Sequence, residues 1–250
     1  MKRSRKIRWP PIALATAVCA ALAAGALWAG LPSAESLRRK NPPSTALIDA
    51  RAREARGKGR PARRNQHWVA LKGISPWLRD AVVNSEDARF YEHEGVDPVQ
   101  MRAALAQAVE GGRARGASTL TQQVAKNLWL GEERSLTRKL KEVVLAHRLE
   151  ALGKDRVLEL YLNIAEWGDG IYGADAAARV WFHKPAAELQ PEEAAILAAM
   201  LPSPRKRNPR KPNAHLRQRA TEILELFGTY KQLSPAEVAA ARERLRTLLT

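Results

Sequence analysis

Residues 9–34 form one long stretch without a charged side chain, directly after eight residues that contain five cations. About 20 consecutive apolar residues suffice to cross a bilayer, so residues 9–31 are predicted to form a transmembrane anchor, with Trp9 and Trp28 at its interfaces. Flanking cations stay in the cytoplasm, which would send the rest of the chain across the membrane. The alternative is a cleaved signal peptide, whose apolar core is typically about 7–15 residues long. Because this stretch is longer, we favour the uncleaved anchor.

Most of the net charge of +16 lies in the first quarter of the chain. Residues 1–64 contain 15 basic and 3 acidic residues, whereas residues 65–250 contain 27 and 23. A nearly balanced globular part argues against a nucleic-acid-binding domain. The pattern divides the N-terminal part into a basic tail (1–8), the anchor (9–31) and a solvated basic linker (32–64), whose cations can lie on anionic lipid headgroups.

From Trp68 onward, helix signals dominate the chain. Helix starts are predicted at Ser75-Pro76, Asp97-Pro98 and Ser118, where a capping residue precedes an apolar stripe at helical spacing. Further helices are predicted within residues 136–144, 157–163 and 192–201, and two more within residues 221–249. No alternating apolar run competes with these patterns, so the predicted fold class is mostly α.

The first segment with candidate chemistry surrounds Glu86. This residue continues the apolar stripe of Leu78 and Val82 into a turn that is rich in polar side chains. Partial desolvation there would raise the pKa of the carboxyl group toward that of a usable general base. A surface carboxylate that closes a helix gives the same pattern, so both interpretations stay open at this point.

The second segment runs from Gly116 to Asn127. Ser118 is placed to cap a helix, and Gln122 and Lys126, four residues apart, project from one face with Gln123 beside them. A helix N-terminus followed by a lysine is suited to binding an anion. Amides and one cation on a solvated helix would look the same.

The third segment is short and strongly charged. Arg138 and Glu142 are four residues apart, with Lys139 and Lys141 between them. This spacing is typical of a surface ion pair, which contributes about 0.3 kcal/mol to the stability of a helix. A carboxylate among three cations would also suit a site for a phosphate-bearing substrate.

Taken together and in this order, the segments resemble the glycosyltransferase domain of the penicillin-binding proteins, which polymerises the glycan strands of peptidoglycan. The family pattern Glu-Asp-x-x-Phe-x-x-His-x-Gly-x-Asp occupies residues 86–97, and Gly-x-Ser-Thr-x-Thr-Gln-Gln-x-x-Lys-Asn occupies residues 116–127. Arg-Lys-x-x-Glu lies at residues 138–142 and Leu-Glu-x-Tyr-Leu-Asn at residues 158–163. The chain has no room for a transpeptidase domain after residue 209, so it resembles the monofunctional biosynthetic members.

The resemblance implies a lysozyme-like, mostly helical lobe with a smaller membrane-proximal jaw over residues 65–210. A C-terminal helical extension is expected over residues 211–250. Within the last motif, Glu159, Tyr161 and Asn163 are expected to support the structure rather than to contact substrate.

The same resemblance implies the roles of the site residues. Glu86 is expected to be the general base toward the acceptor hydroxyl. Glu142 is expected near the departing pyrophosphate, where it would hold a divalent cation or orient Lys126 and Lys141. The residues expected to bind substrate are Asp87, Phe90, Ser118, Gln122, Gln123, Lys126, Asn127, Arg134, Arg138, Lys139 and Lys141.

The implied reaction transfers the growing glycan strand to the GlcNAc 4-hydroxyl of lipid II, forms a β-1,4 link with inversion, and releases undecaprenyl pyrophosphate. The expected cofactor is a divalent cation, Mg²⁺. Expected partners are lipid II, the nascent glycan strand, membrane lipids, and proteins of cell division or elongation, but no nucleic acid. The implied location is the bacterial inner membrane, crossed once, with a cytoplasmic N-terminus and a periplasmic catalytic domain.

Two other functions remain as alternatives. A lytic enzyme that cleaves glycan would also use a glutamate in a lysozyme-like cleft, commonly paired with a second carboxylate. A non-catalytic membrane scaffold would use the basic linker to bind anionic lipids or nucleic acid, and this binding should fall steeply with salt. The Gln-Gln and Arg-Lys-x-x-Glu segments argue against the lytic enzyme, and a scaffold would tolerate Glu86→Gln without loss of its role.

Overall fold

The computed structural model describes residues 28–109, 118–131, 135–230 and 232–250, together with a few single residues between 15 and 26. The chain divides into two compact units, residues 1–33 and 34–250. Within the described residues, no helix has both the length and the apolar character needed to cross a membrane. The anchor predicted over residues 9–31 lies largely outside these residues, so it stays a prediction.

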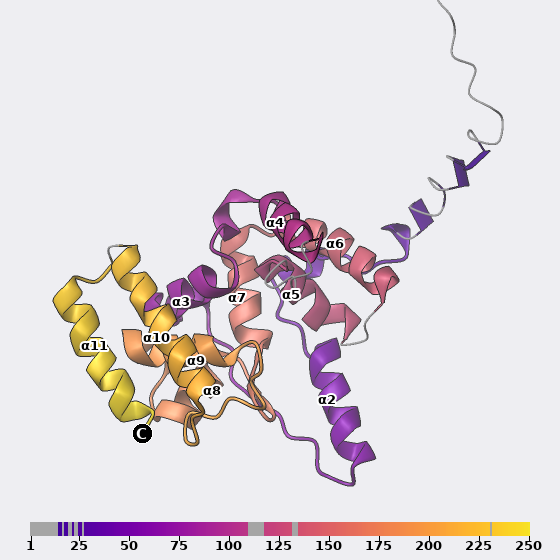
Figure 1. Ribbon diagram of the computed structural model, residues 1–250. Helices are drawn as coiled ribbons and strands as arrows, with labels where there is room; N and C mark the ends of the chain where they lie inside the picture. The colour runs from indigo at the N-terminus through magenta and orange to yellow at the C-terminus, as the bar shows by residue number, and fades with distance from the viewer. Residues whose placement is uncertain are drawn as a thin grey trace, which may run out of the picture. The chain divides into compact units, whose positions relative to one another are not determined.

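The second unit is built mainly from helices, which confirms the predicted fold class (Figure 1). The lysozyme-like division into two lobes stays a prediction. The longer helices are α2 (Ala46–Gly57), α3 (Pro76–Glu86), α4 (Pro98–Val109), α5 (Leu120–Ala125), α6 (Leu136–Glu150), α7 (Lys154–Ile164), α8 (Ala174–Phe182), α9 (Pro191–Met200), α10 (Ala214–Thr229) and α11 (Pro235–Leu248). One π-helical turn, η4 (Lys126–Leu130), continues α5, and single 3-10 turns are η1 (Glu35–Arg38), η2 (Leu71–Gly73), η3 (Phe90–Glu92) and η5 (Ala186–Glu188).

Two buried helices form the centres of the packing. Every residue of α9 is buried, and α3, α10 and α11 pack around it (Figure 1). In α5 every residue except Gln123 is buried, and the helix lies between α6 and α7. Both helices bury polar side chains, Thr121 and Gln122 in α5 and Glu192 and Glu193 in α9, so the surrounding elements must supply hydrogen-bond partners as well as apolar contacts.

The three predicted helix starts differ in how they are capped. Asp97 accepts hydrogen bonds from the backbones of Val99 and Gln100 at the start of α4, whereas Ser75 makes no side-chain cap bond at the start of α3. The predicted cap of α5 at Ser118 is wrong by one residue. Thr119 accepts a hydrogen bond from the backbone of Gln122, whose side chain bonds back to the Thr119 backbone. The threonine oxygen satisfies a backbone N–H that would otherwise lack a partner.

A small sheet fixes the segment before α3. Its strand order is β1 (Asn65–Gln66), β3 (Ile171–Tyr172), β2 (Glu166–Gly168). Strands β1 and β3 are parallel, with Gln66 opposite Tyr172, whereas β2 and β3 are antiparallel with an irregular register. The pairing joins a segment near residue 65 to the end of α7, about a hundred residues later in the chain.

The expectation of a solvated linker over residues 32–64 is wrong where α2 forms. Leu47 and Ile48 of α2 are buried and contact Tyr172. The Nε atom of Arg51 donates a hydrogen bond to Oε2 of Glu166 over 2.9 Å, and α2 packs on η4. The arginines of this segment lie on a helix whose first turn, with Leu47 and Ile48, is buried in the core. A high density of charge was therefore not a sufficient reason to predict a solvated connector.

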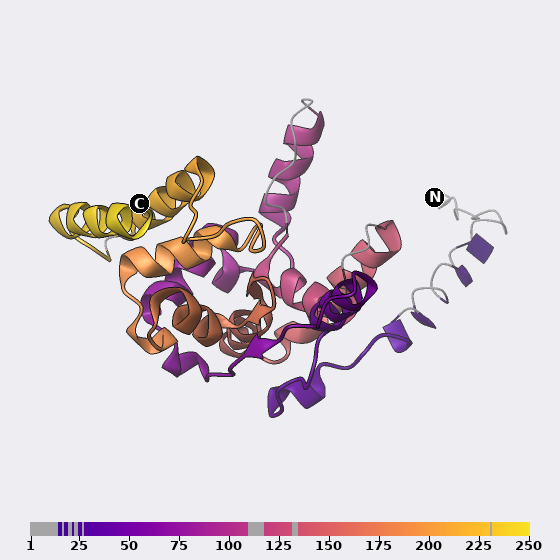
Figure 2. The same ribbon diagram turned by 90° about the horizontal axis from the view of Figure 1, so that it is seen from below.

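Helix α4 and the C-terminal helices differ in how they relate to the rest of the second unit. Figure 2 shows α4 projecting outward from the neighbouring helices. The C-terminal helices α10 and α11 instead form a hairpin on α9 and α3 (Figure 1). The expected C-terminal extension is therefore part of the same compact unit, which ends at Thr250.

Candidate active site

Glu86, the last residue of α3, is held by a chain of hydrogen bonds from two other helices. The Nε2 atom of Gln123 on α5 donates to Oε2 of Glu86 over 3.0 Å. The hydroxyl of Tyr161 on α7 donates to Oε1 of the same glutamine over 3.1 Å. Tyr161, expected to be a structural support, thus fixes which end of the Gln123 amide faces the carboxylate.

Opposing effects act on the pKa of Glu86. Burial raises the pKa because it disfavours the charged carboxylate. The Gln123 hydrogen bond is the main opposing effect, and the positive charges of Arg219, Arg207 and Lys126 also lower the pKa. The net result is a pKa above the ordinary value, which suits a general base better than an unperturbed carboxyl group does.

A cleft of about 540 Å³ opens next to this glutamate. Gln123, which contacts Glu86, is part of its wall, as are Lys126 and Asn127. Four cationic side chains and one carboxylate line the cleft: Arg51, Lys126, Arg205, Lys206 and Glu166. A wall with this excess of positive charge favours an anionic ligand.

Glu142 occupies a second polar cluster, on α6. Its Oε2 accepts a hydrogen bond from Arg138 and its Oε1 one from Lys139, each over 2.5 Å, and only 3% of the residue is exposed. Lys139 also donates to Oγ of Ser118 over 3.0 Å, so the cluster ties α6 to the start of α5. These contacts are with Arg138 and Lys139, and the expected orientation of Lys126 and Lys141 by Glu142 stays a prediction.

Two residues that were expected to bind substrate belong to the core. Phe90 is completely buried, so it offers no surface to a substrate. Asp87 is also buried, and it accepts hydrogen bonds from His93 over 3.0 Å and from the backbone of Leu120 over 2.9 Å. Burial raises the pKa of Asp87, an effect that the Leu120 and His93 hydrogen bonds oppose. The first motif thus largely fastens the turn after α3 to the start of α5.

The remaining predicted residues divide in the same way. Gln122 is buried and serves the capping box of α5. Lys141 is half-buried on α6, beside Glu142. Arg134 lies outside the described residues. Of the predicted substrate-binding residues that the structure describes, Gln123, Lys126 and Asn127 are the ones that line the cleft.

The structure adds two arginines that the motifs did not indicate. Arg219 on α10 donates to the backbone oxygen of Ser85 over 3.2 Å, directly before Glu86 in the chain. Arg207 is buried, donates to the backbone oxygen of Ala199, and lies 3.1 Å from His215. Both lie C-terminal to the recognised motifs, in a region where basic residues are frequent, so no sequence signal distinguished them.

A metal at Glu142 does not fit the contacts of that residue. Both carboxylate oxygens already accept hydrogen bonds from cationic side chains. Among the described residues, no group of three histidine, cysteine, aspartate or glutamate side chains is placed to bind a metal ion. Hard divalent cations bind through several oxygen ligands, which this cluster does not supply.

Comparisons with known proteins agree on one family. The family model described as Transglycosylase matches residues 53–227. A biosynthetic peptidoglycan transglycosylase of Rhodospirillum centenum is 46% identical over 205 residues, which are 82% of this chain and 87% of that protein. The protein of the same name from Pseudomonas entomophila is 45% identical over 185 residues, 74% of this chain and 78% of its own. The matched region includes α3, α5, α6 and most of α10.

Proposed function

The chain belongs to the family of biosynthetic peptidoglycan transglycosylases, and on that premise we propose that it polymerises lipid II into glycan strands. It is a glycosyltransferase of bacterial cell-wall synthesis. The observation that carries the proposal is the position of Glu86, bonded to Gln123 at the wall of a cleft with an excess of cations.

In the proposed step, the 4-hydroxyl of the acceptor GlcNAc attacks the anomeric carbon of the donor MurNAc. The new C–O bond forms as the bond from that carbon to the pyrophosphate breaks, and the hydroxyl proton passes to Glu86. A positioned base of this kind contributes roughly 10²- to 10⁴-fold to the rate. The hydrogen bonds from Tyr161 to Gln123 and from Gln123 to Glu86 hold the carboxylate in position to accept the proton. Because the hydroxyl attacks on the side opposite to the leaving group, the α-linked donor gives a β-1,4 link.

The departing pyrophosphate requires positive charge. Lys126 and Lys206 in the cleft are suited to this role, and Lys139 is a further candidate in the neighbouring cluster. Fixed charges that face the leaving group stabilise the transition state without further reorganisation. We assign Glu142 the role of positioning Lys139 and Arg138, and Arg134 stays a proposed pyrophosphate ligand.

Mg²⁺ remains the proposed cofactor, in a different place from the expected one. Because Glu142 is occupied by Arg138 and Lys139, we assign the cation to the pyrophosphate of the substrate rather than to a protein site. Phosphate oxygens are ligands that Mg²⁺ prefers. No protein residue is assigned to the metal.

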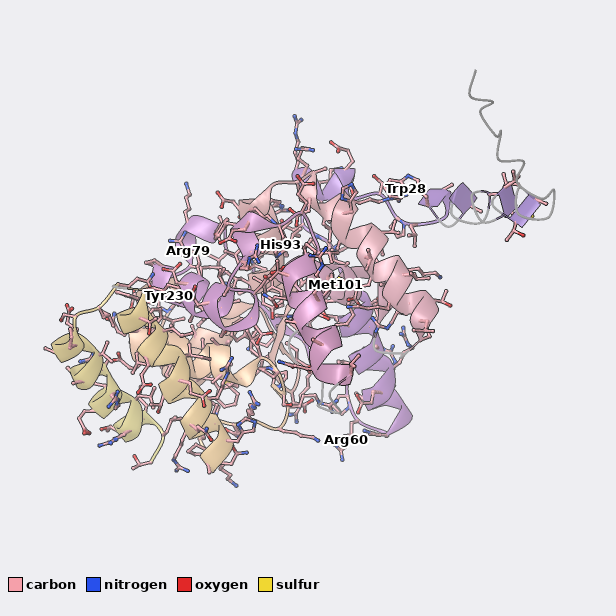
Figure 3. All side chains as sticks on the ribbon, turned by 45° about the horizontal axis from the view of Figure 1, so that its top comes forward. Trp28, Arg60, Arg79, His93, Met101 and Tyr230 are labelled. Carbon is pink, nitrogen blue, oxygen red and sulfur yellow. The ribbon has the colours of Figure 1, made fainter. Side chains whose placement is uncertain are left out.

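We propose that the enzyme works at the periplasmic surface of the inner membrane, which it crosses once through residues 9–31. Apolar side chains on α4 and at the start of α6 support contact with lipid. Val109 is 81% exposed and Leu136 87%, and Val99, Met101 and Leu140 are also exposed. Figure 3 labels Met101 on α4, the helix that projects from the body. Apolar side chains exposed on a projecting helix are suited to entering a lipid surface.

The contacts of Glu142 also bear on the lytic alternative. A glycoside hydrolase uses two carboxyl groups that flank the bond to be cleaved. Here the second carboxylate is buried and engaged by two cations, so it is not available to activate water or attack a sugar. This arrangement favours the transferase.

The test is incubation of the detergent-solubilised protein with labelled lipid II and Mg²⁺. We expect a polymer that muramidase digests, and we expect no release of fragments from purified sacculi. Release of fragments from sacculi without polymer formation would favour the lytic enzyme. A folded protein that does neither would favour the scaffold.

A further inference from the structure

A second pocket, of about 160 Å³, lies next to the cleft at the C-terminal end of α2. Arg51 and Arg205 line both spaces, so their side chains form the wall between them. The charged residues that line the second pocket are Arg51, Lys58, Arg60, Arg63, Arg205, Glu54 and Asp169. No motif considered above includes this pocket.

The pocket is held in shape by contacts between distant segments. The backbone of Asn65 donates to the oxygen of Gly170 over 2.8 Å, which brings the loop after α2 against the β2–β3 turn. Gly170 has φ +75°, and a Cβ atom there would lie 2.5 Å from Cβ of Arg63. Only glycine permits this approach. The backbone of Arg63 is thus fixed beside the pocket, while its side chain is 74% exposed and can reach a ligand.

The charges around the pocket are unequal. Five cationic side chains line the pocket with two carboxylates, and a third carboxylate, Glu166, pairs with Arg51 next to it, so the cations still outnumber the acids. Glu54 bonds to Lys58 over 2.6 Å and to Arg205 over 2.8 Å. The hydrogen bond from Lys58, followed by that from Arg205, lowers the pKa of Glu54 to about 2. The Glu54 carboxylate is therefore negatively charged at neutral pH. Within the described part of the chain, Arg60 has no carboxylate partner.

Tyr172 supplies an independent indication. This residue lines the second pocket and is completely buried, yet its hydroxyl has no hydrogen-bond partner among the described residues. A buried hydroxyl without a partner is costly, and it is a donor suited to an oxyanion. The cations and this donor together point to a ligand with a carboxylate or phosphate group.

We propose that the second pocket binds a carboxylate of the stem peptide that lipid II and the nascent strand carry. The inference rests on the proposed function, because that function supplies the ligand. Its shared wall with the cleft favours substrate over a lipid headgroup: a peptide attached to a sugar in the cleft reaches the pocket past Arg51 and Arg205. The pocket would hold each disaccharide unit by its peptide as well as by its sugars.

The first test measures KM and kcat for lipid II with free peptide carboxylates and for lipid II with amidated carboxylates. We expect the wild type to show a KM about tenfold higher for the amidated substrate, with similar kcat, because a charge-assisted contact is lost. The double variant Arg60→Gln/Arg63→Gln should not distinguish the substrates. The control Arg53→Gln/Arg56→Gln removes the same charge from exposed positions of α2 outside the pocket and should behave as the wild type.

Equal KM values for both substrates in the wild type would overturn the proposal. A control variant that loses discrimination as fully as Arg60→Gln/Arg63→Gln would overturn it too, because the effect would then be general electrostatics. Figure 3 shows Arg60 beyond the end of α2, where its replacement leaves the core untouched.

The variant Tyr172→Phe removes only the unpartnered hydroxyl and should raise KM about threefold.

The second test separates this inference from the proposed function. Equilibrium dialysis of the full-length protein in detergent against radiolabelled stem pentapeptide requires no turnover. We expect binding by the wild type and about tenfold weaker binding by Arg60→Gln/Arg63→Gln. Peptide binding without any polymer synthesis would refute the function and leave the pocket standing. Polymer synthesis without peptide binding would refute the pocket alone.

A lipid phosphate is the other source of an oxyanion, and vesicles distinguish it. Cosedimentation with phosphatidylglycerol vesicles should be equal for Arg60→Gln/Arg63→Gln and Arg53→Gln/Arg56→Gln, because both pairs lose the same charge. If the pocket variant alone binds these vesicles less tightly, the pocket holds a lipid phosphate and the proposal is wrong.

Discussion

At the scale of single residues, the pKa of Glu86 is raised by burial and lowered by its contacts with Gln123 and nearby cations. Burial raises the pKa of its carboxyl group, and Gln123 opposes the rise with a hydrogen bond over 3.0 Å. Because the base acts when ionised, activity should fall as the pH falls through its raised pKa. The acidic limb of the pH profile therefore reports directly on Glu86.

The variant Gln123→Leu tests this balance. Loss of the hydrogen bond removes an effect that lowers the pKa of Glu86, so the acidic limb of kcat/KM against pH should move to higher pH. Tyr161→Phe is the matched control: it removes the bond to Gln123 but not the bond to Glu86, and should shift the limb less. An acidic limb that stays in place in Gln123→Leu would show that Glu86 does not set it.

The motif residues differ in what they contact. Gln123 and Lys126 line the cleft and Glu86 contacts Gln123, while their roles toward substrate stay predictions. Asp87 and Phe90 belong to the same motif but are buried in the core. A sequence motif does not distinguish a residue that contacts substrate from one that holds the neighbouring loop in place, because either role requires one particular side chain at its position.

At the scale of elements, α10 connects the C-terminal hairpin with the active site. Arg219 on this helix bonds to the backbone of Ser85, and its charge lowers the pKa of Glu86. The helix begins at Ala214, earlier than predicted, because Asn213 caps it. An asparagine in a polar stretch is a weak start signal on its own, so this connection was not predictable.

We expect Arg219→Gln to lower kcat/KM at neutral pH several-fold and to move its acidic limb to higher pH, because a charge that favours ionised Glu86 is lost. Arg219→Lys keeps the charge and should lie between the variant and the wild type. Arg246→Gln, at an exposed position of α11, controls for general loss of charge. Identical pH profiles for Arg219→Gln and Arg246→Gln would contradict the link between α10 and Glu86.

Helix α2 provides a prediction about stability. Arg51, 20% exposed, bonds to Glu166, whose side chain is 4% exposed. In Arg51→Met the buried carboxylate loses this cation, so we expect the free energy of unfolding to fall by about 2 kcal/mol, reduced from the fully buried case by partial solvation. The melting temperature, followed by circular dichroism, should fall by about 4–8 °C.

The double variant Arg51→Met/Glu166→Gln checks the cause. It removes the charge that the single variant leaves behind, so it should recover part of the lost stability. If the double variant is less stable than Arg51→Met by the full effect of a second independent change, the two side chains are not energetically coupled.

At the scale of the whole molecule, the chain separates into an N-terminal unit and a folded unit that begins at Ala34. Composition and periodicity sufficed to predict a mostly helical fold and most of its helices. They did not predict α2, whose short apolar stripe lies among arginines, or α8, a nine-residue helix that begins after Gly173 without a side-chain cap. The cleft joins residues from α2, α5, α7 and the segment after α9, a long-range arrangement that no local pattern contains.

Removal of residues 1–33 should leave the melting temperature within about 2 °C of the full chain, because residues 34–250 form their own compact unit. Cosedimentation with lipid vesicles should fall sharply, with a remainder due to the exposed apolar side chains of α4 and α6. A shortened protein that binds vesicles as well as the full chain would argue against the anchor.

The assignment of Glu86 as the base is tested by comparing the wild type with Glu86→Gln in the synthesis of polymer from labelled lipid II. The amide keeps the shape of the side chain but cannot accept the hydroxyl proton as a base. We predict muramidase-sensitive polymer from the wild type and a rate lower by about 10²- to 10⁴-fold in the variant, with an unchanged melting temperature. Polymer synthesis by folded Glu86→Gln at the wild-type rate would contradict the assignment of Glu86 as the base.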